Sequence, residues 1–397
     1  MEKLNKKNLL LQLKSLTVFK NLLKTDLFVG LAKFLASENL EEEIENYSNF
    51  VSIIYNSCLN GGLSNYLLTL CCQDENVYVV LKGKGEKISP FIEESVGREL
   101  EILNFVAHLK PENFISAVNY NGYLPKFEQQ KVDFISEYYS YVENIKKRGY
   151  GIYAKYHSFY VGDNHSIIPV KNPDKISLSQ LIDYNDEREK VVNNTLALLE
   201  NKPSQNVLLT GEAGTGKSST IKAIVNKFYS QGLRIIEVRK NQLSIIPGLL
   251  DSLAENPLKF ILFIDDLSFT TGDDNYNALK AVLEGSVSTK SSNVVIYATS
   301  NRRHIVRESF SERTGDEIHL NDTLSEVLSL SERFGLHVYF GKPSKQTYLK
   351  IVHALCKEKG VEMDKEKIEL LAERYALERG ARSARLAKQF VESLLCG

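Results

Sequence analysis

The sequence predicts an α/β protein whose central parallel sheet is covered by helices on both faces. From residue 207 onward, short apolar runs typical of buried strands alternate with stretches of helical periodicity, which indicates parallel strands joined by crossover helices. The first of these strands runs directly into the glycine-rich loop 211–218, whose form G-x-x-x-x-G-K-S is that of a phosphate-binding loop. After residue 341 only helical periodicity remains, so we expect a helical C-terminal domain to follow the sheet.

We expect three domains in the 397 residues, because a chain of this length can bury more than one core. Residues 1–170 are predicted to form a mostly helical N-terminal domain with a hairpin near 157–170, residues 171–341 the α/β core, and residues 342–397 a helical lid. The first boundary follows from residues 169–175, where two prolines stand in a segment without apolar periodicity.

The same periodicities place the individual elements of the core and the lid. Strand candidates are apolar runs bounded by polar residues or glycine, and helix candidates carry apolar residues three and four positions apart. Strands are expected at Val207–Thr210, Arg234–Val238, Phe260–Ile264, Val294–Ala298 and Leu336–Phe340. Helices are expected at about Ser218–Ser230, Ile246–Ala254, Asp274–Glu284 and Leu324–Phe334, and in the lid at Ser344–Lys359, Lys365–Arg379 and Ala381–Leu395.

Composition and charge describe an ordinary globular chain. Charged residues make up 25% of it and hydrophobic residues 43%, and the net charge is −1, so no global basic field favours nucleic acid or a membrane. The five cysteines are scattered without paired metal-ligand spacing, which is typical of reduced thiols. No window reaches the roughly 18 apolar residues that a membrane span needs, and no signal-peptide cleavage site follows the N-terminal lysines. We therefore expect a soluble, cytoplasmic protein without a membrane partner.

The loop after the first core strand has the residue types that phosphate binding requires. Gly211, Gly214 and Gly216 let the backbone turn so that its N–H groups can approach phosphate oxygens, and the helix behind them adds the positive end of its dipole. Lys217 can reach the β- and γ-phosphates, and the Ser218 hydroxyl can serve Mg²⁺. The predicted nucleotide-binding residues are Gly211, Glu212, Ala213, Gly214, Thr215, Gly216, Lys217, Ser218 and Ser219.

Polar residues at two other strand ends complete a catalytic site. The strand Phe260–Ile264 ends in Asp265, which can hold the Mg²⁺ shell together with Ser218, and in Asp266, which can orient or deprotonate the attacking water. Asn301 follows the strand that begins at Val294. Because the carboxyl ends of parallel strands share one crevice, Asn301 is expected near the γ-phosphate.

Three arginines and one dipeptide are candidates at the margins of this site. Arg333 stands just before the last strand, where it can project toward a neighbouring subunit or pair with a surface glutamate, Glu326 or Glu332. Arg382 stands at the start of the last lid helix and can return a guanidinium to the phosphates, as can Arg385 three residues later on the same helix face.

The dipeptide Asp183-Tyr184 stands just ahead of the helix that approaches the phosphate loop. Its side chains could wall the adenine. Asp183 could equally cap that helix, because a short carboxylate at this position can accept hydrogen bonds from the first backbone N–H groups.

In order and content these motifs resemble those of the AAA+ ATPases. In that superfamily the phosphate loop would be Walker A, Asp265-Asp266 Walker B, Asn301 sensor 1, Arg333 the arginine finger and Arg382 sensor 2. The resemblance implies a P-loop NTPase fold, ATP and Mg²⁺ as cofactors, and ATP hydrolysis. It also implies a homo-oligomer, either a ring or an open ring, in which Arg333 completes the site of a neighbour.

Three stretches narrow the resemblance to a bacterial AAA+ family of ATP-binding proteins designated domain of unknown function 815. They are residues 263–269, 297–304 and 330–335, and the likeness extends from about Tyr150 to the C-terminus. It implies the ATPase sites and carries no substrate.

Two features depart from most AAA+ motors. The second Walker B acid is Asp266 where most have glutamate, an arrangement that also occurs in replication initiators and helicase loaders, so we expect slow turnover. The segment after the second core strand, residues 242–248, lacks the aromatic of a protein-threading pore loop, which disfavours an unfoldase.

The leading hypothesis is therefore an ATP-hydrolysing protein that remodels or loads an unidentified partner, a protein or a nucleic acid. One alternative is an ATP-dependent switch that barely turns over. Another is a nucleic-acid protein of the initiator type, for which Tyr150, Tyr153 and Tyr156 among basic residues could form a stacking surface, although a packed helix face explains the same spacing. A GTPase is disfavoured because no Asn-Lys-x-Asp motif occurs.

Overall fold

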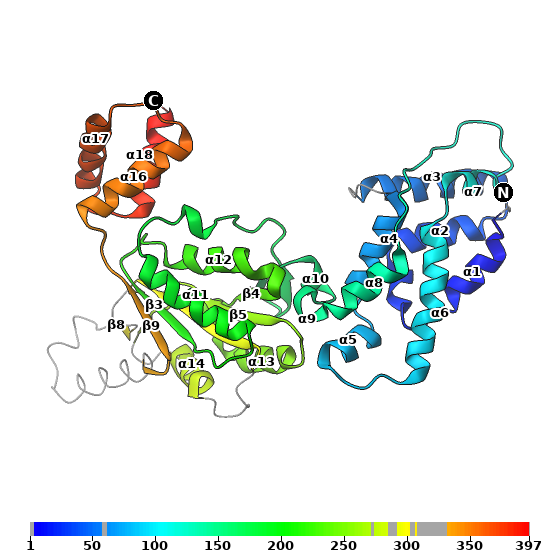
Figure 1. Ribbon diagram of the computed structural model, residues 1–397, viewed down its shortest axis with the longest axis horizontal. Helices are drawn as coiled ribbons and strands as arrows, with labels where there is room; N and C mark the ends of the chain where they lie inside the picture. The colour runs from blue at the N-terminus through cyan, green and yellow to red at the C-terminus, as the bar shows by residue number, and fades with distance from the viewer. Residues whose placement is uncertain are drawn as a thin grey trace. The chain divides into compact units, whose positions relative to one another are not determined.

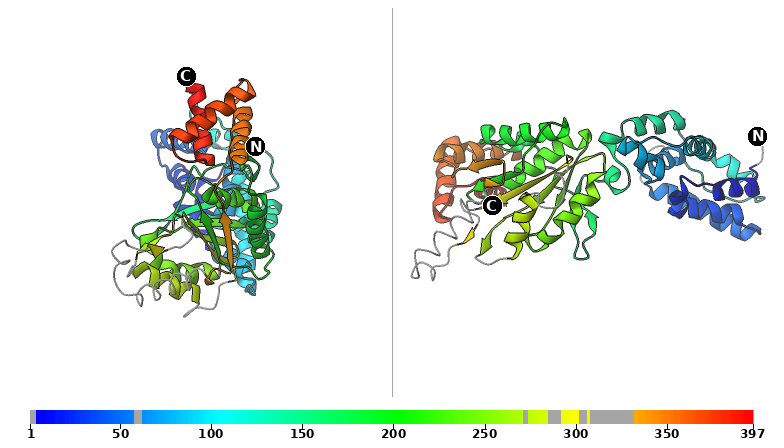
Figure 2. Two further views of the ribbon diagram at one scale, coloured as in Figure 1. Left: turned by 90° about the vertical axis from the view of Figure 1, so that its left-hand side faces the viewer. Right: turned by 90° about the horizontal axis from the view of Figure 1, so that it is seen from below.

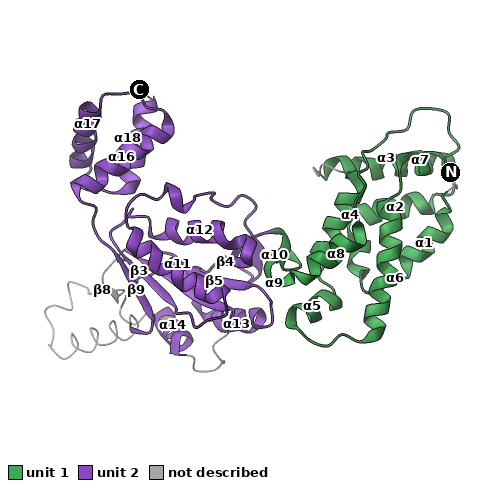
Figure 3. Cartoon of the chain, viewed as in Figure 1, with its two compact units in different colours: residues 1–155 green, residues 156–397 purple. Residues whose placement is uncertain are grey.

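A computed structural model describes residues 4–57, 62–270, 274–284, 292–301, 306–307 and 332–396 of the chain. The chain forms two compact units, Met1–Lys155 and Tyr156–Gly397 (Figure 3). The first unit has a core between helices, and the second has a core around a sheet. None of the helices in the described ranges has the length and apolarity needed to span a membrane.

The first unit is built mainly from helices, as the sequence predicts (Figure 1). Asn39 caps helix α3 by accepting a hydrogen bond from the Glu42 N–H at 3.0 Å. Aromatic rings cluster within the core, where the Phe114 ring centroid lies 5.3 Å from that of Phe50 and 5.9 Å from that of Tyr47. The helices are α1 (Lys6–Lys14), η1 (Lys20–Lys24), α2 (Asp26–Ala36), α3 (Leu40–Asn56), α4 (Gly62–Gln73), α5 (Val77–Lys84), α6 (Pro90–Ala107), α7 (Pro111–Ile115), α8 (Phe134–Glu143), α9 (Ile145–Arg148) and α10 (Ile152–Lys155).

The three tyrosines considered as a nucleic-acid stacking surface do not lie on one helix face. Tyr150 is buried in the core of the first unit. Burial raises the pKa of the Tyr153 hydroxyl above its ordinary value, and Tyr156 belongs to the second unit. Of the three, only Tyr153 lies within α10 (Ile152–Lys155), so their three-residue spacing is not that of a single helix.

The second unit is organised around a seven-stranded sheet, which confirms the predicted fold class. The strand order is β2-β1-β4-β5-β7-β3-β9, and every neighbouring pair is parallel except β1 with β2. β3, β5 and β7 are buried at every residue, which explains their continuous apolar sequences. The strands are β1 (Ser158–Val161), β2 (Ile167–Pro169), β3 (Val207–Gly211), β4 (Leu233–Glu237), β5 (Lys259–Ile264), β7 (Val294–Ser300) and β9 (Leu336–Phe340).

The predicted hairpin near 157–170 exists, but it does not belong to the N-terminal domain. Its strand β1 pairs in parallel with β4, with Ser158 opposite Ile235 and Tyr160 opposite Glu237. The hairpin thereby covers an edge of the sheet that would otherwise expose unpaired backbone groups. The boundary between the compact units accordingly falls after Lys155 rather than after residue 170.

Helices cover both faces of the sheet (Figures 1 and 2). On one face α11 (Asn185–Leu199) and α12 (Lys217–Phe228) pack on the alternate strand residues, such as Leu209 and Phe263, that form one core cluster. α13 (Ile246–Ala254) and α14 (Asp274–Glu284) lie on the other face. Helices α12, α13 and α14 match three of the four predicted core helices. The fourth, Leu324–Phe334, lies outside the described residues except for 332–334.

Smaller elements complete this unit. The segment considered as a pore loop forms a 3₁₀-helix, η4 (Lys240–Ile245), and then enters α13. The Gln242 amide of η4 donates to the carbonyls of Val161 and Gly162 at 3.3 and 3.2 Å, which fixes η4 to the hairpin. The others are η2 (Leu178–Gln180), η3 (Tyr229–Gln231), and the short parallel pair β6 (Phe269–Thr270) and β8 (Val306–Arg307).

The C-terminal lid contains three helices with clear termini: α16 (Lys345–Lys359), α17 (Lys365–Glu378) and α18 (Ala384–Cys396). Ser344 accepts the Thr347 N–H at 3.0 Å and so caps α16, and Gly360 ends that helix with φ of 67°. Tyr348, Val352 and Phe390 pack in the lid core.

Candidate nucleotide-binding site

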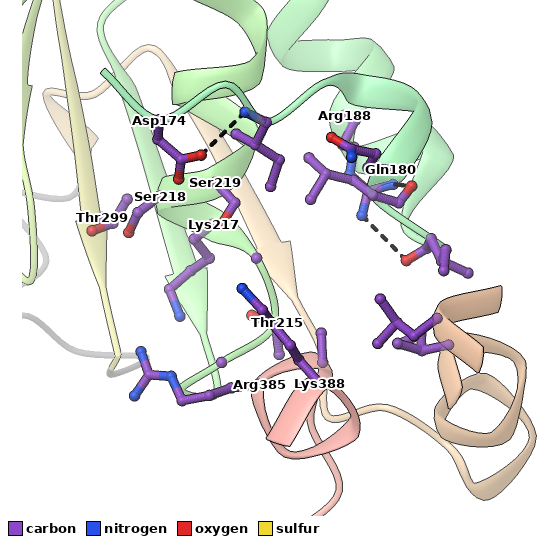
Figure 4. A pocket seen from close by; sticks show the side chains of 18 of the residues that line it. Asp174, Gln180, Arg188, Thr215, Lys217, Ser218, Ser219, Thr299, Arg385 and Lys388 are labelled. Atoms are coloured by element: carbon purple, nitrogen blue, oxygen red, sulfur yellow. Dashed lines mark hydrogen bonds between the residues drawn. The ribbon is translucent and has the colours of Figure 1, made fainter. Parts of the chain in front are cut away.

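A cavity of about 800 Å³ lies at the carboxyl ends of β3, β5 and β7 (Figure 4). One wall is the phosphate loop with the polar strand ends, and the opposite walls are the segment 174–182 and the lid helices α16 and α18. This is the crevice in which open parallel sheets bind their ligands.

The glycines of the loop are required by its backbone. Gly211 has φ of 134°, and a Cβ there would lie 1.9 Å from the Phe340 carbonyl oxygen, so only glycine fits beside β9. Gly216 has φ of 92° and precedes the first residue of α12. Gly214, with φ of 76°, touches the lid, because its carbonyl oxygen accepts the Arg385 N–H at 3.4 Å.

Lys217 is the cation of the loop. Lys217 is buried, with only 5% of the residue exposed. Its ammonium donates to the carbonyls of Gly211 and Glu212 at 2.9 and 2.8 Å and to Asn301 Oδ1 at 2.9 Å. Burial lowers the pKa of Lys217, and the nearby carboxylates of Asp265 and Asp266 counteract that shift. The sequence prediction that these strand ends converge on Lys217 therefore agrees with the geometry.

The residues proposed for Mg²⁺ are adjacent. The Ser218 hydroxyl donates to Asp265 Oδ1 at 2.6 Å. A hydroxyl and one carboxylate beside a phosphate loop fit Mg²⁺, which takes oxygen ligands and is commonly held by one or two carboxylates together with substrate phosphates. No cluster of three or more carboxylate, imidazole or thiol side chains suited to a metal occurs in the described part of the chain.

Asp266 and Asn301 form the other half of the site. The Asn301 amide donates to Asp266 Oδ1 at 2.7 Å while its oxygen accepts from Lys217. Asp266 has φ of 51°, in the left-handed region that only a few per cent of non-glycine residues adopt. Such outliers cluster at functional sites, where the surrounding contacts hold them.

Thr299 is a site residue that the sequence analysis missed. It is 2% exposed, and its hydroxyl bonds both Asp265 Oδ1 and the Asp266 N–H. Strand periodicity could have indicated it, since residues 299 and 301 lie on the same side of the β7 end.

The lid contributes Arg385 rather than Arg382. Arg382 donates from Nε and Nη2 to the Glu373 carboxylate at 3.1 and 2.8 Å and is not part of the cavity lining. Arg385 and Lys388 line the cavity and extend from α18 toward the phosphate loop (Figure 4). The expectation that both arginines share a helix face is wrong because α18 begins at Ala384, after Arg382.

Asp183 and Tyr184, predicted as a possible adenine wall, do not line the cavity. Both residues have positive φ, 62° and 57°. The Tyr184 hydroxyl donates to the Gly341 carbonyl at 2.6 Å, and no side chain caps α11. The residues that do line the cavity here are Leu181 and Ile182.

A buried arginine supports that lining. Arg188, 6% exposed, donates to the carbonyl oxygens of Leu181 and Ile182 at 2.7 and 3.3 Å. Burial lowers the pKa of Arg188 to about 10. Its guanidinium fixes the backbone that faces the cavity.

Arg333 lies away from the cavity lining. Its guanidinium forms an ion pair with Glu284, the last residue of α14, and not with Glu332. Glu326, the other surface partner considered, lies outside the described residues.

The sheet order, the glycine-rich loop and the cluster around Lys217 define a P-loop fold of the kind that the resemblance to the AAA+ ATPases implies. The sequence model of the family described as "Protein of unknown function (DUF815)" matches residues 154–397, and the chain belongs to this family. The match begins at residue 154, two residues before the start of the second compact unit at Tyr156.

The chain is also similar to solved structures of RuvB from Thermotoga maritima. One RuvB variant is 16% identical over 55% of this chain and 64% of that one, with a TM-score of 0.37. The RuvB Holliday junction branch migration motor is 17% identical over 54% of this chain and 63% of that one, with a TM-score of 0.36. The chain thus spans less than two thirds of the length of these structures.

Proposed function

We propose that the protein binds ATP with Mg²⁺ at this site, hydrolyses it, and uses the cycle to remodel or load a protein or nucleic-acid partner. The observation that carries the proposal is the hydrogen-bonded cluster of Lys217, Ser218, Asp265, Asp266 and Asn301 at three neighbouring strand ends. Each residue type suits phosphoryl transfer to water, in which positioning and charge stabilisation supply most of the catalysis.

The residues divide the work by position. The loop backbone and Lys217 bind the phosphates, and Ser218 with Asp265 would hold Mg²⁺, which supplies charge neutralisation at the phosphates when bound. Asp266, oriented by the Asn301 amide at 2.7 Å, accepts a hydrogen bond from the attacking water. Arg385 and Lys388 add positive charge from the lid.

Phosphate release under steady-state conditions tests this proposal. The wild type should release phosphate from ATP in the presence of Mg²⁺, and Asp266→Asn should bind ATP equally well without turnover. Equal release by both proteins would contradict the role of Asp266. ATP binding without release by the wild type would instead favour the ATP-dependent switch.

A second arginine acts between subunits in this proposal. Arg333 belongs to a homo-oligomer, a ring or an open ring, in which it exchanges Glu284 for the phosphates of a neighbour. An arginine supplied in trans is typically worth about 10³–10⁵ in rate, whereas an exposed ion pair contributes under about 1 kcal/mol. The absence of Arg333 from its own cavity lining and its proximity to α14 support a role outside its own site.

Mixing two inactive variants tests the trans arrangement. Arg333→Ala and Lys217→Ala should each lack activity alone and regain part of it when combined, because some interfaces then pair an intact arginine with an intact loop. No rescue, together with activity per subunit that stays constant on dilution, would make Arg333 a surface residue and the enzyme a monomer. The client can be sought by capture on Asp266→Asn held with ATP.

A further inference from the structure

We infer that Thr299 is the positioning residue that aligns the two Walker B carboxylates, a role that rests on the proposed ATP site. The hydrogen bonds of the site form a closed circuit. It runs from Lys217 through Asn301, Asp266, Thr299, Asp265 and Ser218, which is the next residue in the chain after Lys217. Thr299 lines the cavity beside these residues, and it is the one member of this circuit whose hydroxyl bonds both aspartates.

The direction of the two Thr299 bonds is fixed by chemistry. Its hydroxyl accepts the Asp266 N–H at 3.0 Å, since the amide can only donate. Its single proton is donated to Asp265 Oδ1 at 2.5 Å. The side chain is 2% exposed, so water does not compete for either bond.

The first bond stabilises the unusual backbone of Asp266. With φ of 51°, this residue stays in the left-handed region only if neighbouring groups hold it. Its N–H donates to the Thr299 hydroxyl at 3.0 Å and to Asp265 Oδ1 at 3.2 Å, and Asn301 holds its carboxylate at 2.7 Å. Removing the Thr299 hydroxyl releases the shorter of the two N–H bonds and weakens the restraint that keeps the carboxylate at the water position.

The second bond sets the rotation of the Asp265 carboxylate. The hydroxyls of Ser218 and Thr299 and the Asp266 N–H, at 3.2 Å, all converge on Oδ1. Oδ2 therefore has no donor among the described residues, and it is the oxygen that remains for the Mg²⁺ shell. Without Thr299 this discrimination between the two oxygens weakens.

Thr299→Val tests the inference, because valine keeps the shape and removes only the hydroxyl. In the nucleotide-free protein, hydrogen exchange at the Asp266 amide should accelerate, which requires no catalysis. The Mg²⁺ concentration that half-saturates binding of a fluorescent ATP analogue should rise about tenfold, and kcat should fall about ten- to a hundredfold, as expected for lost hydrogen bonds to a charged group. KM for ATP should change less than about threefold, since the phosphate loop is untouched.

Thr299→Ser restores the hydroxyl and should return the exchange, the Mg²⁺ requirement and kcat to near wild-type values. Thr195→Val is the matched control. Thr195 is fully buried in the same unit, and its hydroxyl bonds the Val191 carbonyl and the Tyr297 hydroxyl at 2.8 Å each, away from the site residues. This variant should lose stability but leave the Mg²⁺ requirement and kcat unchanged.

The inference is overturned if Thr299→Val leaves both the Asp266 exchange and the Mg²⁺ requirement unchanged, or if Thr195→Val shifts them equally. If the wild type binds the analogue but releases no phosphate, the proposed hydrolysis fails while the exchange and the Mg²⁺ titration still judge Thr299. Should the valine variant not fold, Thr299→Cys offers similar volume with a weaker donor. It should then show a smaller shift in the same direction, and no shift would overturn the inference.

Discussion

Replacing Arg385 by alanine separates the two arginines that the sequence could not rank. Arg385 lines the cavity from the first turn of α18, and its backbone N–H contacts Gly214 of the phosphate loop. Arg382 is held by Glu373, whose side chain is 14% exposed and which Lys345 also approaches at 3.5 Å. This pairing keeps the pKa of the Glu373 carboxyl below its ordinary value.

The expected magnitudes follow from these environments. A hydrogen bond from an arginine to a phosphate is worth about 1.5–3 kcal/mol, and solvent at the exposed Arg385 reduces this, so ATP affinity should fall about five- to thirtyfold in Arg385→Ala. Arg382→Ala removes a partly exposed ion pair, so it should lower the stability of the lid by about 1 kcal/mol. Its affinity for ATP should change by less than about twofold.

Titration with a fluorescent ATP analogue measures the two affinities, and protease protection of the lid by a slowly hydrolysed analogue measures the coupling to the nucleotide. Protection should be lost in Arg385→Ala and kept in Arg382→Ala. The opposite pattern, with affinity lost only in Arg382→Ala, would refute the assignment and would mean that Arg382 leaves Glu373 when nucleotide binds.

Three further predictions concern the site and its sheet. Lys217→Ala should abolish ATP binding by calorimetry, because it removes the cation that the loop encloses; wild-type affinity would disprove the loop assignment. Asp265→Ala should lose Mg²⁺-dependent binding while Asp266→Asn keeps binding and loses turnover, and equal loss of binding would contradict their separate roles. His337 is an exposed residue of β9 whose ring bonds the Thr210 hydroxyl at 2.8 Å. Partial desolvation of the ring lowers the pKa of His337 below its ordinary value of 6.5, so the folded state favours the neutral ring. Its contribution to stability is full above that pH and is lost as the pH falls below it. Denaturant unfolding at a series of pH values should therefore show a shallower acid loss in His337→Gln, and an unchanged slope would exclude this histidine.

The parts of the fold and site that depend on local pattern could be predicted from the sequence. The five expected strands are present because buried parallel strands need continuous apolar runs. Such runs can be recognised in the sequence without knowing which strands pair. Lys217, Asp265 and Asn301 converge because the carboxyl ends of parallel strands meet at one edge.

The remainder depended on geometry that no local pattern encodes. Strand β1 pairs with β4 across more than 70 residues of chain, so the hairpin could be predicted but its place in the sheet could not. At the lid, a helix start two residues after Arg382 decides which arginine faces the loop. Two successive left-handed residues, Asp183 and Tyr184, turn the predicted adenine wall away from the cavity.

The contacts of Lys217 show how binding and water activation are linked in this site. An ammonium has three donors, and all three are used here, by the carbonyls of Gly211 and Glu212 and by Asn301 Oδ1. A phosphate can receive a hydrogen bond from Lys217 only if one of these three acceptors gives up, or shares, the N–H of the ammonium that it now accepts. The two carbonyls belong to the loop that must itself enclose the phosphate, whereas Asn301 is a side chain that also donates to Asp266. We therefore expect a γ-phosphate to displace Asn301 more easily than the two carbonyls, and we expect this displacement to act directly on Asp266, the carboxylate proposed to orient the water.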